Sequence, residues 1–254
     1  MKDEPNAGGD ALELRIDRKT FVSADGTPVE VIRGLNLRLE VGSFGALMGP
    51  SGCGKTTALR IAAGLDEDFA GMRRVPGSGR LGIVFQDPRL LPWRTVEENI
   101  RLVLPADEAR ADLDHLVDTL GLASHMARYP GELSLGLARR AAIARAFALR
   151  PKFLLLDEPL VSLDESTAAR LREELFLLTR RERMTTLCVT HSLSEAIQLA
   201  DHLFFLCPRP TRVIFEKRLA LSGMPRCKAD ISSIEKEIRD ALARLDGLNP
   251  APAT

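Results

Sequence analysis

The sequence predicts an α/β protein whose core is a mixed or parallel sheet, preceded by an antiparallel β layer and interrupted by an inserted helical subdomain. Three observations predict this fold. A glycine-rich loop joins a short apolar run to a helix, and further apolar runs follow it at wide intervals. A long stretch between two of those runs carries helix signals and no strong strand signal.

The glycine-rich loop covers residues 49–57 (GPSGCGKTT) and follows the apolar run at 46–48. It matches the G-x-x-x-x-G-K-[ST] pattern, in which backbone N–H groups cradle the phosphates of a nucleotide. Lys55 adds a charge for the β- and γ-phosphates, and the Thr56 hydroxyl can ligate Mg²⁺. All nine residues are candidate nucleotide contacts: Gly49, Pro50, Ser51, Gly52, Cys53, Gly54, Lys55, Thr56 and Thr57. The sequence thus predicts a phosphate-loop NTPase core, with a helix from Lys55 that stops at Gly64.

Composition excludes several other classes of protein. The chain has 254 residues, enough for one large α/β domain or one domain with a small insertion. Its 35 basic and 35 acidic side chains give a formal net charge of zero, which argues against nucleic acid as a partner. We find no apolar stretch of the roughly 18 residues that cross a bilayer, and no secretory signal. The four cysteines lack C-x-x-C spacing, which favours reduced thiols in a cytosolic protein.

In the N-terminal part of the sequence, apolar and polar residues alternate as they do in β-strands. Residues 1–10 are polar and expected to be disordered. Apolar and polar residues then alternate over 12–16 and over 35–41, with turn signals at 25–26 and 33–34. We expect these segments to form the antiparallel β layer.

The central part alternates between buried strands and helices. Three apolar runs lack alternation, as parallel strands buried on both faces do: 81–85, 153–156 and 186–190. Asp164 can cap the helix that follows it, and Ser192 with Glu195 forms a capping box. This order of elements predicts a doubly wound sheet.

Residues from about 88 to 150 form the predicted helical subdomain, in which Thr95 and Glu98 make another capping box. We assign residues 11–222 to one main domain that contains this subdomain, and 223–254 to a C-terminal helical extension. In the extension, five apolar residues share one helix face: Ile231, Ile234, Ile238, Leu242 and Leu245. That stripe favours packing against the chain's own domain over binding a partner.

The strand at 153–156 ends in two acids, Asp157 and Glu158. In a phosphate-loop protein this pattern places one carboxylate to hold Mg²⁺, directly or through water, and the next to polarise a water. Two acids after a strand can also be a solvated strand end. The phosphate loop upstream favours the functional interpretation.

Together with these motifs, four more segments occur in the order found in ATP-binding cassette (ABC) ATPases, and residues 11–220 resemble that family. The four matching residues or segments are Gln86 at the end of the strand 82–85 (Q-loop), 133–137 (LSLGL, signature), 162–164 (SLD, D-loop, ending in Asp164) and His191 (switch histidine). Phe21 lies where the family places an aromatic ring against adenine. The resemblance implies an ABC ATPase domain with ATP and Mg²⁺ as cofactors.

The resemblance also implies a role for each residue. Two cassettes close head to tail on two ATP molecules, and each ATP lies between one phosphate loop and the other subunit's signature. The implied catalytic residues are Glu158, which orients and deprotonates the attacking water, with His191, Lys55 and Gln86. The implied Mg²⁺ ligands are Thr56, Gln86 and Asp157. The implied ATP contacts beyond the phosphate loop are Phe21, Ser134, Gly136 and Asp164.

The signature is irregular, because Leu135 replaces its first glycine and Leu137 its glutamine or methionine. Glycine permits close approach of the backbone to a phosphate, so Leu135 either blocks that approach or folds outward if the helix begins earlier. We expect the chain still to hydrolyse ATP. The alternatives are a cassette that binds nucleotide but closes poorly, or one that pairs with a different cassette.

Residues 86–93 (QDPRLLPW) with 95–99, and 207–212 (CPRPTR), resemble importer cassettes of the nitrate, sulfonate, taurine and bicarbonate group. That resemblance implies a peripheral subunit on the cytoplasmic face of the inner (plasma) membrane. Its implied partners are an integral membrane permease subunit, a second cassette and, indirectly, a periplasmic or extracellular solute-binding protein. Trp93 is expected to line the groove for the permease; the alternative is that Trp93 only packs the helical subdomain.

Two other classes of protein fit less well. A soluble ABC protein acting on DNA or ribosomes usually has two cassettes, coiled-coil insertions or basic patches. We expect Arg139, Arg140 and Arg145 to form a solvated or ion-paired helix face rather than a nucleic-acid site. A small-molecule phosphate-loop kinase gives no reason for LSLGL, Asp164 and His191 to occur together.

Overall fold

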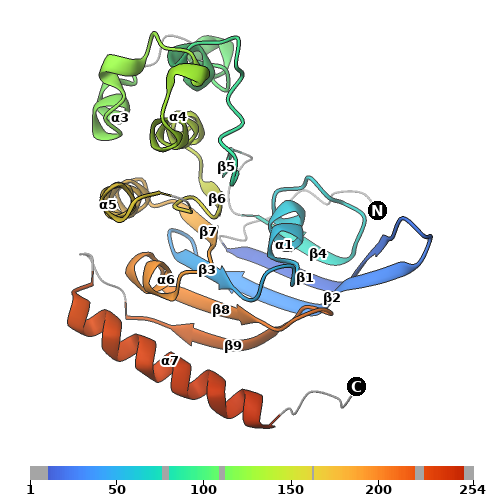
Figure 1. Cartoon of the computed structure of the whole chain (residues 1–254). Coiled ribbons are helices and arrows are strands. Elements are labelled where there is room, and N and C mark those ends of the chain that lie inside the picture. Colours follow the sequence, from blue (N-terminus) through green and yellow to red (C-terminus); the bar gives the residue numbers. More distant parts are fainter. Residues whose placement is uncertain (1–10, 76–79, 109–111, 162, 221–225, 249–254) are drawn as a thin grey trace.

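The computed structural model describes residues 11–75, 80–108, 112–161, 163–220 and 226–248. Two sheets lie at the centre, helices α2 to α4 stand at one end, and α7 runs along the opposite end (Figure 1). This architecture confirms the predicted α/β fold. It has a phosphate-loop core, an antiparallel β layer and an inserted helical part. The predicted disorder of residues 1–10 and the predicted boundary after residue 222 lie outside the described residues.

The antiparallel layer is a three-stranded sheet with the order β2-β1-β4. Its strands are β1 (Leu12–Val22), β2 (Pro28–Leu39) and β4 (Ala70–Arg74). Alternation over 12–16 turns apolar side chains toward the core, as predicted. The alternation predicted through Val41 runs too far, because β2 ends at Leu39 and Val41 is exposed in a turn. We did not predict β4, whose five residues are all exposed.

The larger sheet has six strands in the order β5-β6-β7-β3-β8-β9. The strands are β3 (Phe44–Met48), β5 (Leu81–Val84), β6 (Phe153–Asp157), β7 (Thr185–Val189), β8 (His202–Leu206) and β9 (Val213–Arg218). The first five in this spatial order pair in parallel, and β9 pairs antiparallel with β8. Leu154 packs in one apolar cluster and Leu155 in the other, so β6 is buried on both faces, as its unbroken apolar run predicted.

Three helices begin and end close to their predicted signals. Helix α1 (Lys55–Ala62) is followed by Gly64 at a φ of 72°, a left-handed conformation that suits glycine. Helix α5 (Glu165–Arg181) is capped by Asp164, whose carboxylate accepts from the Thr167 N–H at 3.0 Å. Helix α6 (Leu193–Leu199) is capped by the hydroxyl of Ser192.

Only half of the predicted Ser192–Glu195 capping box forms. The Ser192 hydroxyl accepts from the Glu195 N–H at 3.3 Å. The Glu195 carboxylate does not reach back to Ser192, because it accepts from the Thr190 hydroxyl at 2.8 Å. The segment after β7 is therefore fixed by a side chain of the helix that follows.

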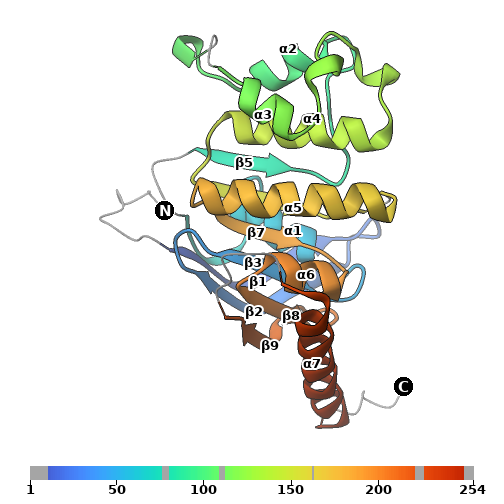
Figure 2. The ribbon, with the colours of Figure 1, turned by 90° about the vertical axis from the view of Figure 1, so that its left-hand side faces the viewer.

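The helical part between β5 and β6 contains α2 (Val96–Arg101), α3 (Asp114–Thr119) and α4 (Leu135–Ala148). Three short 3-10 helices join them: Ala106–Glu108, Ala123–His125 and Pro130–Glu132. The predicted capping box of Thr95 and Glu98 is present at the start of α2. Figure 2 shows these helices stacked beyond β5, on the far side of α5 from β3.

Helix α7 (Lys228–Leu248) packs against its own domain. Ile231 and Ile238 are buried in the same apolar cluster as residues of α6. The apolar face of α7 thus packs against the chain's own domain, as predicted. No helix in the described part of the chain is long and apolar enough to cross a membrane.

Candidate active site

The phosphate loop lies between β3 and α1, where a buried parallel strand leads into a helix N-terminus. Gly54 has a φ of 116°, and a Cβ there would lie 3.1 Å from both the Thr211 hydroxyl and Val31, so only glycine fits. Lys55 is buried, and its Nζ donates to the carbonyl oxygens of Gly49 (2.7 Å) and Pro50 (2.9 Å). The ammonium group is thus held across the mouth of the loop by main-chain atoms.

Asp157 ends β6 beside the start of α1 and is buried. Burial, with the charge of Glu158, raises the pKa of the Asp157 carboxyl, and a hydrogen bond from Thr56 and the charge of Lys55 oppose that rise. The Thr56 hydroxyl and the Asp157 carboxylate are hard oxygen donors, which fit Mg²⁺. The described residues contain no group of three or more His, Cys, Asp or Glu side chains that could hold a metal.

Glu158 and His191 stand next to each other at the ends of β6 and β7. The Glu158 Oε2 lies 3.5 Å from the His191 Nδ1, and the carboxylate is much less exposed than the imidazole. Glu158 has a φ of 47°, and its N–H donates to the Val189 carbonyl at 2.9 Å. A left-handed conformation in a residue other than glycine is typical of functional positions.

Gln86 lies at the same edge of the sheet. We predicted it at the end of a strand, and this position is wrong by one residue. Strand β5 ends at Val84, which pairs with Leu156, and Gln86 follows two residues later with an exposed side chain. No hydrogen bond among the described residues joins Gln86 to Thr56 or Asp157. The three predicted Mg²⁺ ligands therefore lie at one edge of the sheet, and a hydrogen bond joins two of them, Thr56 and Asp157.

Of the three arginines on α4, Arg139 is buried and Arg145 is half-buried, and both bond to main-chain carbonyls, so the prediction of a solvated or ion-paired face is wrong for these two. Arg139 donates to the Pro159 carbonyl at 3.4 Å. Arg145 donates to the carbonyls of Pro88 and Arg89, both at 2.8 Å. Burial lowers the pKa of both guanidinium groups. Sequence reasoning missed these residues because a helical pattern does not show when an arginine bonds to main-chain carbonyls.

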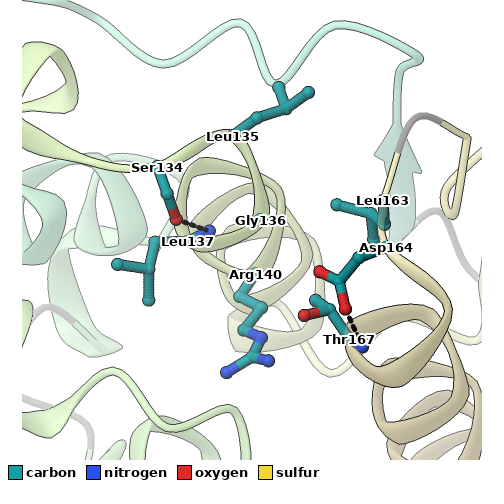
Figure 3. Close-up of a pocket in the computed structure, with 8 residues that line it drawn as sticks. All are labelled: Ser134, Leu135, Gly136, Leu137, Arg140, Leu163, Asp164 and Thr167. Carbon is teal, nitrogen blue, oxygen red and sulfur yellow. Dashed lines mark hydrogen bonds between the residues drawn. The ribbon is translucent and has the colours of Figure 1, made fainter.

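A pocket of about 310 Å³ lies between the first turns of α4 and α5 (Figure 3). We call it the signature pocket, and its lining residues are Ser134, Leu135, Gly136, Leu137, Arg140, Leu163, Asp164 and Thr167. None of these described residues belongs to the phosphate loop. The chain therefore presents the signature and D-loop residues together, on a surface separate from its own phosphate loop.

The irregular signature begins a helix. The Ser134 hydroxyl accepts from the Leu137 N–H at 3.3 Å, so Ser134 caps α4 and Leu135 is its first residue. The Leu135 side chain is 47% exposed and points away from Gly136 and Asp164 (Figure 3). This orientation favours the second of the two sequence-based alternatives, in which Leu135 folds outward.

Asp164 is fixed in the signature pocket by local hydrogen bonds. Its carboxylate accepts from the Ser166 hydroxyl at 2.6 Å and from the Thr167 N–H at 3.0 Å. These bonds hold the pKa of Asp164 well below its usual range, so the group is ionised at neutral pH. Ser162, the first residue of the predicted D-loop segment, lies outside the described residues.

Phe21 lies on β1 with its ring 43% exposed. The Lys19 ammonium is 4.6 Å from the centre of that ring. The predicted adenine platform is therefore accessible, and a cation lies against it.

A phosphate loop, an acid pair at the end of a neighbouring parallel strand, and a histidine beside the second acid define the phosphate-loop class of nucleotide triphosphatases. Within that class, the separate signature pocket is the feature that the sequence analysis linked to ABC ATPases. The sequence matches the ABC transporter family over residues 32–161.

Similar proteins agree with this match. The aliphatic sulfonates import ATP-binding protein SsuB of Bacillus licheniformis is 40% identical over 92% of this chain and 93% of its own length. SsuB 2 of Pseudomonas syringae pv. tomato is 39% identical over 86% of this chain and 91% of its own. A solved dimeric ATP-binding cassette in a post-hydrolysis state with ADP and Pi has a TM-score of 0.70. It shares 26% identity and is matched over 84% of this chain and all of its own.

The chain belongs to the ABC transporter family, and within it to the ATP-binding subunits. The predicted family and enzyme class, an ABC-type ATPase, are confirmed at this level.

Proposed function

We propose that this chain is the ATP-hydrolysing subunit of an importer for aliphatic sulfonates or a chemically similar small solute. One observation carries the proposal. A phosphate loop, the Asp157–Glu158 pair and a separate signature pocket occur in one chain, whose relatives are named for sulfonate import. The solute contacts other subunits, so its class rests on those relatives alone.

Each site residue has a role that its position supports. Lys55 and the loop amides hold the phosphates, and Glu158 orients the attacking water and takes its proton. We assign the contact with the γ-phosphate to His191, whose Nδ1 lies 3.5 Å from the Glu158 carboxylate. Thr56, Asp157 and Gln86 would hold Mg²⁺, which supplies charge neutralisation at the transferring phosphoryl group. Phe21 stacks on adenine.

A second cassette would complete the site. Ser134, Gly136 and Asp164 lie in the signature pocket, away from the chain's own phosphate loop, and we assign them to the ATP of a partner subunit. The solved dimer with ADP and Pi supports this arrangement for a similar fold. Asp164 is rigidly held and ionised, which suits a residue that couples two sites across an interface.

A membrane permease is the second proposed partner, and it places the chain on the cytoplasmic face of the membrane. Trp93 is 71% exposed, so it does not pack the helical subdomain, and the groove role is the better account. An exposed tryptophan is a typical anchor at protein interfaces. A solute-binding protein would act on the permease and not touch this chain.

Two measurements test the proposal. The purified native chain is expected to hydrolyse ATP, and Glu158→Gln to lower kcat about 10²-fold, the scale of losing one essential group. In cells that lack this chain, the native chain and not Glu158→Gln is expected to restore uptake of a labelled aliphatic sulfonate. Near-normal hydrolysis by Glu158→Gln would remove that residue from its role. Nucleotide binding without hydrolysis would favour a cassette that closes poorly. Hydrolysis without restored uptake would leave an ATPase of another transporter or of a soluble ABC protein.

A further inference from the structure

Lys19 is a buried lysine to which the proposed mechanism gives no role. Its side chain is 2% exposed, and it lies on β1 two residues before Phe21. An ammonium group is buried in a protein only where charged or polar groups replace its water. Its partners therefore indicate what the burial achieves.

Lys19 fastens β1 to the segment that follows the phosphate-loop helix. Its Nζ donates to the Asp66 carboxylate at 2.8 Å and to the Asp68 carbonyl at 2.5 Å. On the other side, Lys19 pairs with Ile32, which would lie 3.6 Å from a Cβ on Gly54. The segment after α1 thus holds the ammonium group, while the strand that carries Lys19 pairs with the strand that packs against Gly54 of the loop.

The same ammonium group lies over the ring of Phe21, 4.6 Å from its centre, within the range of a cation–π contact. The Phe21 ring remains 43% exposed, so a ligand can still reach it. Because Asp66 and Asp68 hold the ammonium group in place, Lys19 also fixes the ring.

We propose that Lys19 is a positioning residue that gives the site its preference for purine nucleotides, acting through the ring of Phe21. This rests on the proposed function, in which adenine stacks on that ring. A cation at one face of an aromatic ring draws π density toward itself, so the other face stacks better with an electron-rich base. A purine offers two fused rings to that stack and a pyrimidine only one. Loss of the cation therefore weakens binding of ATP more than binding of CTP.

The test compares Lys19→Met with the native full-length chain, using ATP and CTP with saturating Mg²⁺. We expect the KM for ATP to rise about fivefold, within the range of a partly buried cation–π contact. The kcat and the KM for CTP are expected to change less than about twofold. Lys19→Arg keeps the cation and is expected to restore the KM for ATP. Lys19→Met with Asp66→Asn repeats the comparison without an unpaired carboxylate.

Phe21→Leu completes a double-mutant cycle. In that background Lys19→Met is expected to leave the KM for ATP unchanged, since the ring through which Lys19 acts is gone. Equal rises in the KM for ATP and CTP, or the same rise without the ring, would show that Lys19 only stabilises the fold and would overturn the proposal. A native chain that binds nucleotide without turnover would count against hydrolysis by the isolated chain and not against the role of Lys19. In that case, calorimetry measures the affinities of the native chain and of Lys19→Met for ATP and CTP, and these replace the KM values in the comparison.

Discussion

Arg145 donates a hydrogen bond of 2.8 Å from its guanidinium group to the carbonyl oxygen of Arg89, and a second to Pro88. These carbonyls follow Gln86 by two and three residues, whereas Arg145 stands on α4, whose first turn lines the signature pocket. Arg89 has a φ of 48°, and its guanidinium lies 4.1 Å from the centre of the Phe85 ring. One side chain thus joins the signature helix to the segment that carries Gln86.

Replacing Arg145 by methionine leaves two main-chain carbonyls without donors and frees the segment after Gln86. Such a loss typically costs about 1–3 kcal/mol. Because the affected segment carries Gln86 and not the phosphate loop, we expect kcat for ATP to fall about tenfold, equivalent to ~1.4 kcal/mol. The KM for ATP should change little. Steady-state hydrolysis at several ATP concentrations measures both.

Arg180→Met is the matched control for Arg145→Met. Arg180 also bonds through its guanidinium, to the Asp201 carboxylate and the Leu199 carbonyl, far along the chain from Gln86. The Arg180→Met variant is expected to have a lower Tm, while its kcat stays within about twofold of the native value. If both variants lowered kcat alike, the effect of Arg145 would be one of general stability.

The raised pKa of Asp157 makes a prediction about stability and pH. Burial and the charge of Glu158 raise this pKa above its ordinary 3.8, so the ionised form destabilises the fold. This loss in the free energy of unfolding is absent below the pKa of the Asp157 carboxyl in the unfolded chain. It appears as the pH rises through the pKa of the same group in the folded chain. Asp157→Asn is therefore expected to raise the Tm at pH 7 by a few degrees, and the gain should shrink toward pH 4. Thermal unfolding without nucleotide at both pH values measures it. An equal gain at both would contradict the electrostatic cause.

Much of the fold could be predicted because local signals and burial agree. The glycine pattern at 49–57, the apolar run at 153–156 and the cap at Asp164 each sit where the structure has the corresponding element. Strands β4 and β9 could not be predicted. Strand β4 is exposed throughout and β9 is nowhere fully buried, so pairing with a neighbour rather than apolar alternation makes them strands.

The site was predictable where chemistry requires particular residue types, and not where packing decides. The neighbouring positions of Asp157, Glu158 and His191 follow from parallel strands that end at one edge. The hydrogen bonds of Arg145 and Lys19 to main-chain carbonyls do not, because both depend on segments that come together only in the folded chain. A basic residue looks like a surface residue until its partners are known.

Trp93→Ala tests the proposed permease contact. The side chain is 71% exposed, so its loss is expected to change the free energy of unfolding by no more than about 0.5 kcal/mol. Binding to the membrane subunit is expected to weaken at least about tenfold, as for an interface tryptophan. Co-purification with the membrane complex measures this. Leu177→Ala removes another exposed apolar side chain, on α5, and should leave co-purification unchanged. Retention of Trp93→Ala on the complex would exclude Trp93 from the interface.

Leu135→Gly tests whether the irregular signature limits hydrolysis. Leu135 is the first residue of α4 with its side chain pointing outward, so we expect the native chain to be active. Its rate should rise faster than linearly with protein concentration, since two copies form the site. Leu135→Gly should alter kcat by less than about threefold, with up to about 1 kcal/mol of helix stability lost. Leu135→Ala removes the bulk without that flexibility and separates the two effects. If the native chain is silent and both variants restore turnover, the leucine blocks closure, and the cassette depends on its membrane partner or on a different cassette.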